Sequence, residues 1–196
     1  PESFRFYDVT ANLDLSLSSS DRISMTLFRS GDDMYFPFNQ NLVFDVNHGN
    51  TAGVIGWRHM GGDSWLTRIT ASASRYFSDS NALLTRAPFS RSTELIDAAL
   101  KGQAEYFFGN AHSMKTGFQL GIQRFDVHDI HGGMTALNRS MEPRYGAGYV
   151  AGSFDLSPLW TIQGGVRSAY YQTGDHLRFS PRLRVEFRPF GTIRFH

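Results

Sequence analysis

Apolar and polar residues alternate along most of the chain, which is the pattern of β-strands whose two faces meet different environments. Between residues 179 and 188, every odd position is apolar and every even position is polar or charged. The same period of two recurs at 7–17, 23–27, 55–57, 65–74, 96–106, 114–123 and 160–167. We expect strands there, a further strand across 145–156, and a last one that starts at Ile193. The pattern does not assign the faces of Tyr145–Leu156, where a β-bulge would fit.

The connections between these segments alternate between short turns and long polar loops. The short turns are predicted at Ser18–Arg22, Met60–Ser64, Gly109–Ser113, Ser157–Leu159 and Pro189–Gly191. The long loops are predicted at about Ser30–Asn50, Ser78–Thr93 and Asp126–Pro143. Many strand segments reach about 9–11 residues, the length of a membrane-spanning strand. Aromatic residues, among them Trp57, Trp65, Tyr106 and Trp160, gather near their ends.

These features predict an all-β fold. We expect an antiparallel transmembrane β-barrel section of about nine to ten strands, with short periplasmic turns and long extracellular loops. The alternation predicts a lipid-facing set: Leu13, Leu15, Ile69, Leu100, Phe118, Leu120, Ile162, Val166, Leu183, Val185 and Phe187. It predicts a lumen-facing set: Arg68, Lys101, Glu105, Arg167, Arg182, Arg184, Glu186 and Arg188. A register shift by one residue would expose arginines to lipid at about 2–4 kcal/mol each, so the register is strongly fixed.

Composition narrows the function classes. The net charge of the 196 residues is only +1, so charge gives no support to nucleic-acid binding. The chain has no cysteine, which excludes disulfides and thiol chemistry within it. It begins at Pro1 and shows no signal peptide, so either processing removed a leader or the chain is a piece of a longer protein.

Candidate chemistry is sparse. The segment Asp126–Gly133 offers His128 and His131 as weak metal ligands, but its spacing matches no metal-site template, and a polar loop tip is the preferred interpretation. Gly31–Asp33 is interpreted as a turn, because the spacing of a calcium loop is absent. No phosphate loop, zinc-protease helix or nucleophile elbow occurs. We therefore expect no enzyme activity and no cofactor.

The arginines of the lumen-facing set allow two readings. They could guide anionic substrates, since arginine binds carboxylates and phosphates through two parallel hydrogen bonds. They could equally form structural ion pairs, as the position of Glu186 between Arg184 and Arg188 suggests. We favour the structural reading.

Several segments resemble the barrel of TonB-dependent outer-membrane receptors. The stretch Tyr149–Phe195 is similar in its order of motifs: a tyrosine-led strand, Gly165-Val166-Arg167, Tyr170 and Ser180-Pro181-Arg182-Leu183. Residues 6–36 are similar to an earlier hairpin, with Ser18 and Asp21-Arg22 in its turn, and residues 50–76 to the hairpin that follows. Each motif is degenerate, so the specificity lies in their order and spacing.

The resemblance implies energised uptake of a scarce ligand, of the siderophore-iron, cobalamin or oligosaccharide class, across the Gram-negative outer membrane. Outer-membrane lipid, a plug domain and TonB would be the partners, with no role for nucleic acid. The chain departs from the family in Ala151-Gly152, where Gln-Asp is common, and in its last residue, His196, which is not aromatic. It also lacks a plug and a TonB box, and has far fewer than about twenty-two strands. We therefore expect residues 1–196 to be a section of a receptor barrel domain that lacks both ends.

Two other function classes stay open. One is a complete small outer-membrane barrel of about eight to ten strands, acting as an anchor or membrane enzyme. The other is a soluble β-barrel that binds an apolar ligand. An even strand count and a terminal aromatic would favour the first, and extraction without detergent would favour the second.

Overall fold

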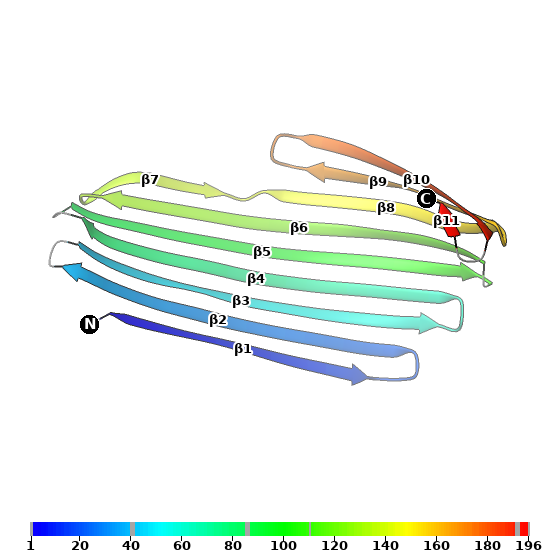
Figure 1. The fold of residues 1–196 in the computed structure, drawn as a ribbon, viewed down its shortest axis with the longest axis horizontal. Coiled ribbons are helices and arrows are strands. Elements are labelled where there is room, and N and C mark those ends of the chain that lie inside the picture. Colours follow the sequence, from blue (N-terminus) through cyan, green and yellow to red (C-terminus); the bar gives the residue numbers. More distant parts are fainter. Residues whose placement is uncertain (1, 40–41, 85–86, 110, 191–192, 196) are drawn as a thin grey trace.

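The chain forms one antiparallel sheet in a computed structural model that describes residues 2–39, 42–84, 87–109, 111–190 and 193–195 (Figure 1). Its strands are β1 (Ser3–Ser16), β2 (Asp21–Asn39), β3 (Leu42–Gly61), β4 (Trp65–Leu84), β5 (Ala87–Phe108), β6 (His112–His131), β7 (Met134–Met141), β8 (Arg144–Ser157), β9 (Trp160–Tyr171), β10 (His176–Phe190) and β11 (Ile193–Phe195). No helix among the described residues is long and apolar enough to cross a membrane.

Strands that are neighbours in the sequence are neighbours in the sheet. The order is β1-β2-β3-β4-β5-β6-β8-β9-β10-β11, and β7 pairs with β6 beside this path. The nine strands and the start of a tenth predicted from the sequence are confirmed, and β7 is an addition. In the part of the chain that the structure describes, β1 pairs with β2 alone and β11 with β10 alone, so the sheet is open at both edges.

The long polar loops predicted from the sequence are wrong, because these segments are paired strands. Ser30 lies directly opposite Asn50, and Ser78 directly opposite Thr93, each well inside a hairpin. Most of Asp126–Pro143 belongs to β6 and β7, and Gly31–Asp33 lies within β2 instead of forming a turn. Polar side chains are tolerated on both faces of a strand outside a membrane, so the alternation fades while the backbone pairing continues.

The hairpins formed by β2–β3, β4–β5 and β6–β7 therefore extend well past β8, β9 and β10 at one end of the sheet. The strand β5 has 22 residues, or roughly 70 Å at about 3.3 Å per residue. An apolar membrane band is only about 25 Å tall. The tips of β2–β3, β4–β5 and β6–β7 lie at one end, called the long-hairpin end, and β8, β9 and β10 stop well short of it (Figure 1).

The predicted short turns lie at the opposite end, called the short-turn end (Figure 1). At Met60–Ser64, Gly62 has a φ of 62°, which glycine adopts without strain. The predicted turn at Pro189–Gly191 is only partly tested: Pro189 and Phe190 belong to β10, and Gly191 lies outside the described residues.

The cross-strand register divides the side chains between two faces. All eleven residues predicted to face lipid share one face, called the apolar face. The register pairs them across the ladders with one another or with other residues of that face: Leu13 with Met25, Leu100 with Leu120, Ile162 with Val185. The eight residues predicted to face the lumen share the opposite face, called the charged face, where Lys101 pairs with Gln119 and Arg182 with Gly165.

The register also resolves the strand across residues 145–156. It runs without interruption from Arg144 to Phe154 against β6, and shifts only between Asp155 and Ser157 against β9. Val150 pairs with Val166 on the apolar face, and Tyr149 with Arg167 on the charged face. The even positions were ambiguous in the sequence because glycines at 146, 148 and 152 leave them without side chains.

The sheet is a single layer and has almost no core. The buried apolar residues among those described are Ala82, Ala147 and Ala169, and no large side chain is fully buried. On the apolar face Leu183 is 76% exposed and Leu120 is 52% exposed. Apolar burial is the main force that stabilises a fold in water, so this face needs an apolar environment to cover it.

Candidate functional site

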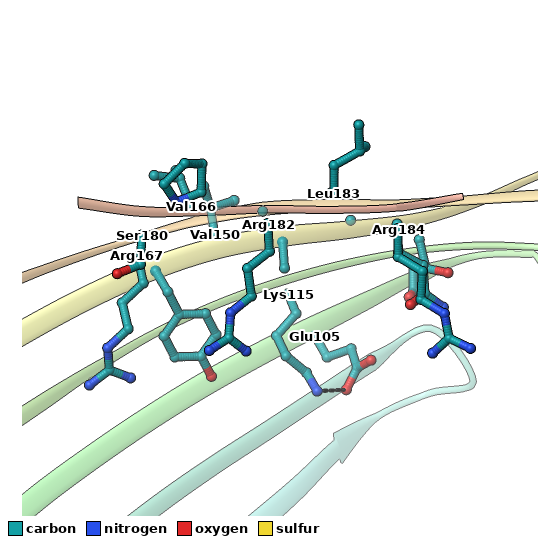
Figure 2. A pocket seen from close by; sticks show the side chains of 18 residues that line it. Glu105, Lys115, Val150, Val166, Arg167, Ser180, Arg182, Leu183 and Arg184 are labelled. Atoms are coloured by element: carbon teal, nitrogen blue, oxygen red, sulfur yellow. Dashed lines mark ion pairs between the residues drawn. The ribbon is translucent and has the colours of Figure 1, made fainter. Parts of the chain in front are cut away.

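The charged face lines an open hollow of about 1030 Å³ formed by β5, β6, β8, β9 and β10. Arg182, Arg184 and Arg167 point to the side on which the rest of the sheet lies in Figure 2, together with Lys115 and Glu105. Leu183 and Val166 point the other way. Lys115 Nζ lies 3.4 Å from Glu105 Oε2, so one cation of the hollow is paired within the wall.

Glu186 organises the arginines at the short-turn end of β10. Its side chain is almost fully buried, and Arg188 Nε lies 2.7 Å from its Oε1. Arg184 Nη2 lies 3.6 Å from its Oε2. A buried carboxylate is costly unless it is paired, so the two flanking arginines stabilise it in place. The ion pairing predicted around Glu186 is present.

Tyrosine side chains cover glycines on the same face. A Cβ built on Gly121 would lie 2.2 Å from the Tyr145 ring, and one on Gly117 would lie 2.6 Å from the Tyr149 hydroxyl. Gln119 Nε2 donates to the Tyr145 hydroxyl at 3.2 Å, and the Tyr149 hydroxyl donates to Gln103 Oε1 at 3.1 Å. The missing side chains make room for each ring against the neighbouring strand.

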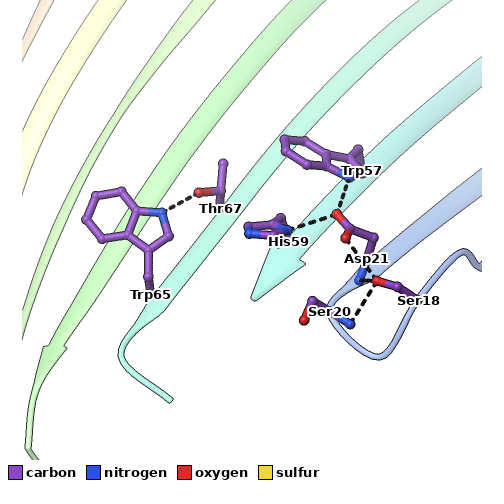
Figure 3. Close-up of polar contacts among 7 residues, drawn as sticks. All are labelled: Ser18, Ser20, Asp21, Trp57, His59, Trp65 and Thr67. Carbon is purple, nitrogen blue, oxygen red and sulfur yellow. Dashed lines mark hydrogen bonds and ion pairs between the residues drawn. The ribbon is translucent and has the colours of Figure 1, made fainter. Parts of the chain in front are cut away.

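Polar aromatic side chains mark the short-turn end of the apolar face (Figure 3). Trp57 Nε1 donates to Asp21 Oδ1 at 3.1 Å, and Trp65 Nε1 donates to Thr67 Oγ1 at 2.7 Å. In the preceding turn, Ser18 accepts from the backbone N–H of Asp21 at 3.0 Å. Indoles that are apolar on one side and hydrogen-bonded on the other suit a boundary between lipid and water.

A row of arginines marks the other limit of the apolar face. Arg29, Arg75 and Arg124 lie in one line across β2–β6, with Thr51 and Ile96 between them. Arg75 pairs with Glu94, and Arg124 with Asp126, on that face. The apolar face therefore ends at this line.

Beyond this line, apolar side chains also occur on the side of the charged face. In β2 the apolar positions change from the odd Ile23, Met25 and Leu27 to the even Met34 and Phe36. The register places a set of apolar side chains on the same side as the charged face, called the aromatic patch: Phe4, Phe6, Met34, Phe36, Phe38, Phe44, Val46 and Phe89. The sequence analysis missed this patch, although the change of phase within β2 is a signal that could have found it.

The weak metal candidates are not brought together. His128 and His131 differ by an odd number of positions along β6, so they project from opposite faces. The neighbouring carboxylate, Asp129, is paired with Arg91, whose Nε and Nη2 lie 2.8 Å and 2.7 Å from the two carboxylate oxygens. No group of three potential metal ligands occurs within the described residues. The hydrogen bond from Arg91 also holds the pKa of Asp129 below its ordinary value.

No protein-family model matches the sequence, and no curated protein sequence matches it. Solved structures do match. The RagAB peptide transporter has a TM-score of 0.80 at 10% identity, over 98% of this chain and 31% of that chain. The alcaligin receptor FauA from Bordetella pertussis has a TM-score of 0.70 at 12% identity, over 95% and 33%. The ferric yersiniabactin uptake receptor FyuA from Yersinia pestis has a TM-score of 0.69 at 11% identity, over 93% and 34%.

The chain thus spans about a third of the length of these similar chains. At such low identities the comparison speaks for the fold alone. The all-β fold and the resemblance predicted from the sequence are both confirmed at that level. In fold, this chain is similar to a section of the barrel of TonB-dependent receptors.

Proposed function

We propose that this chain is part of the wall of an outer-membrane receptor barrel that takes up a scarce ligand with energy delivered through TonB. The observation that carries the proposal is the division of one single-layer sheet into an apolar and a charged face. In this assignment the apolar face contacts lipid between the indoles of Figure 3 and the row of Arg29, Arg75 and Arg124. The charged face lines the lumen.

The backbone supports the assignment to an outer membrane. All spanning segments in hydrocarbon must hydrogen-bond within the protein, and strands achieve this only in a closed barrel. The sheet is open at β1 and β11 among the described residues, so further strands must complete the wall. The rest of the receptor, including a plug domain, would supply closure and the coupling to TonB. No enzyme activity is part of this proposal.

The ligand would contact the long-hairpin end. The aromatic patch there is exposed, with Phe6 68% and Phe38 65% accessible, and it lies on the side assigned to the lumen. Apolar and aromatic side chains above a charged channel suit a ligand with a planar or apolar part. The proposed classes are siderophore-iron, cobalamin and oligosaccharide. The names of the similar proteins refer to ferric chelates and to a peptide.

A growth experiment tests the uptake function. In the bacterium that encodes the protein, deletion of its gene should abolish growth when iron chelate, cobalamin or oligosaccharide is the limiting nutrient. Deletion of TonB should produce the same defect, and the plasmid-borne gene should restore growth only in the TonB-containing strain. Normal uptake of all three ligand classes in the deletion strain, or uptake that survives the loss of TonB, would contradict the proposal.

A further inference from the structure

Three arginines stand side by side on the charged face near the short-turn end of the sheet. In the register, Arg22 of β2 lies opposite Arg58 of β3, and Arg58 lies opposite Arg68 of β4. Directly opposed positions have Cβ atoms only about 5 Å apart, and like charges placed there destabilise a sheet. Such a row persists at low cost only if negative charge compensates it.

The wall itself supplies too little negative charge. Asp14 Oδ1 lies 3.4 Å from Arg22 Nε, which accounts for one of the three cations. Within the described part of the chain, no carboxylate forms an ion pair with the guanidinium of Arg58 or Arg68. The cluster therefore keeps an excess of two positive charges.

The three arginines line an open hollow that has room for a small anion. Arg22, Arg58 and Arg68 line a space of about 210 Å³ together with the hydroxyl residues Ser24 and Thr70 and with Asp14, the carboxylate paired with Arg22. Gly56 lies between these two hydroxyl residues, and a Cβ at this position would come within 3.1 Å of Ser24 Oγ. The glycine thus keeps the floor of the hollow free. At about 30 Å³ for each water molecule, this volume corresponds to about seven waters, so the hollow has room for one phosphate or carboxylate group.

We propose that Arg22, Arg58 and Arg68 form a binding site for one oxyanion, a phosphate or a carboxylate. Guanidinium groups bind both through parallel charged hydrogen bonds, and the hydroxyls of Ser24 and Thr70 add neutral donors. The oxyanion comes either from solution or from an acidic side chain of a polypeptide segment inside the barrel. The site requires only the register and the hollow, so it goes beyond the proposed uptake function and can fail or hold independently of it.

The test uses the whole protein that carries this chain, purified in detergent at low ionic strength. Inorganic phosphate is titrated calorimetrically into the wild type and into the variants Arg58→Gln and Arg68→Gln. The matched control is Arg29→Gln, which removes an arginine of β2 from the other face. We expect phosphate binding in the wild type and in the control, and at least about tenfold weaker binding in both site variants.

The thermal midpoint of unfolding distinguishes the two sources of the oxyanion. If a carboxylate of the protein itself fills the site, phosphate does not bind, and Arg58→Gln and Arg68→Gln lower the midpoint while Arg29→Gln does not. If the arginines are merely opposed like charges, phosphate does not bind, and removing one of them leaves the midpoint unchanged or raises it. That last result, or phosphate binding equal in all four proteins, overturns the proposal.

Discussion

At the residue scale, arginine supplies nearly all of the positive charge: the chain has 17 arginines, and its two lysines are Lys101 and Lys115. Arginine stays charged at every accessible pH and can hold two acceptors at once. Glu186, held between Arg184 and Arg188, shows this use inside the wall. The positive charges of the charged face therefore persist throughout the accessible pH range.

Adjacent residues of β10 test the assignment of the two faces. Because the chain has no cysteine, single cysteines at Arg182 and Leu183 introduce unique labels within it. In membranes, Arg182→Cys should react with a water-soluble maleimide, and Leu183→Cys only with a lipid-soluble one, since the register places them on opposite faces. Rapid water-soluble labelling of Leu183→Cys would reverse the assignment.

The contact between Gly121 and Tyr145 predicts a stability effect. Gly121→Ala should lower the free energy of unfolding by about 1–3 kcal/mol, because the new methyl group displaces the tyrosine ring and its bond from Gln119. Gly164→Ala is the control, since its Cβ would meet Leu183 at an ordinary 3.9 Å. Urea titration of the whole protein measures both.

A double variant checks the cause of that effect. In a Tyr145→Ala background, Gly121→Ala should cost clearly less than it does alone, because the ring that it displaces is gone. Equal costs in both backgrounds would show that the tyrosine is not the reason for the glycine.

At the element scale, the long strands are composites. The strand β2 carries Ile23, Met25 and Leu27 on the apolar face, and Met34 and Phe36 on the side of the charged face, with the polar Arg29–Asp33 between the two groups. The first part suits a membrane and the second a wet outer extension whose inner side is apolar. Such a strand has no single hydrophobic period along its length, although its backbone pairing is continuous.

This composite character explains what the sequence could and could not predict. The strand parts between the indoles and the arginine row have a strong period of two, so residues such as Ile69, Leu100 and Val185 were assigned to a common face correctly. The extensions lack that period, and they were taken for loops. The row of Arg22, Arg58 and Arg68 depends on the register of three strands, which a pattern along one strand cannot supply.

The topology predicts a common side for the three long hairpins. Epitope tags inserted in the connections β2–β3, β4–β5 and β6–β7 should all be accessible to antibody on intact cells, because the strand ends that flank these connections lie at one end of the sheet. A tag in the Met60–Ser64 turn is the control and should be accessible only after the outer membrane is opened. One hidden hairpin tag beside two accessible ones would contradict the topology.

The Arg91–Asp129 pair predicts that the stability of the long hairpins depends on pH. The pKa of Asp129 is lowered mainly by the hydrogen bond from Arg91, so the pair stabilises the fold above the ordinary carboxyl pKa of about 3.9. This stabilisation is lost as the pH falls through the lowered value. Asp129→Asn should therefore destabilise the protein at pH 7, and the difference from wild type should shrink in strong acid.

The control for this pH effect is a carboxylate in a turn. Asp63→Asn, in the Met60–Ser64 turn, should change the free energy of unfolding little at either pH. A difference between wild type and Asp129→Asn that stays constant from neutral to strongly acidic pH would show that the charge of Asp129 is not what stabilises the hairpins.

At the scale of the whole molecule, both faces of the single-layer sheet need to be covered. Lipid would cover the apolar face, and a plug or channel water would meet the charged face. The fold was predictable because one repeated pattern, a period of two with aromatic residues near the strand ends, recurs in part of β1 to β6, β9 and β10. Closure of the sheet into a barrel was not predictable from the sequence, because it depends on strand number, tilt and shear together.

The last prediction concerns the 196-residue chain by itself. It should not insert into a membrane as a stable monomeric barrel, because β1 and β11 leave unpaired edges among the described residues and hydrocarbon offers no water to satisfy them. The curvature of a section that matches about a third of larger chains would also be too shallow to close. The chain is refolded in detergent micelles and run on a gel with and without heating. We expect no compact band that shifts on heating and resists protease; such a band would identify a complete small barrel and favour the anchor or membrane-enzyme alternative over the receptor wall.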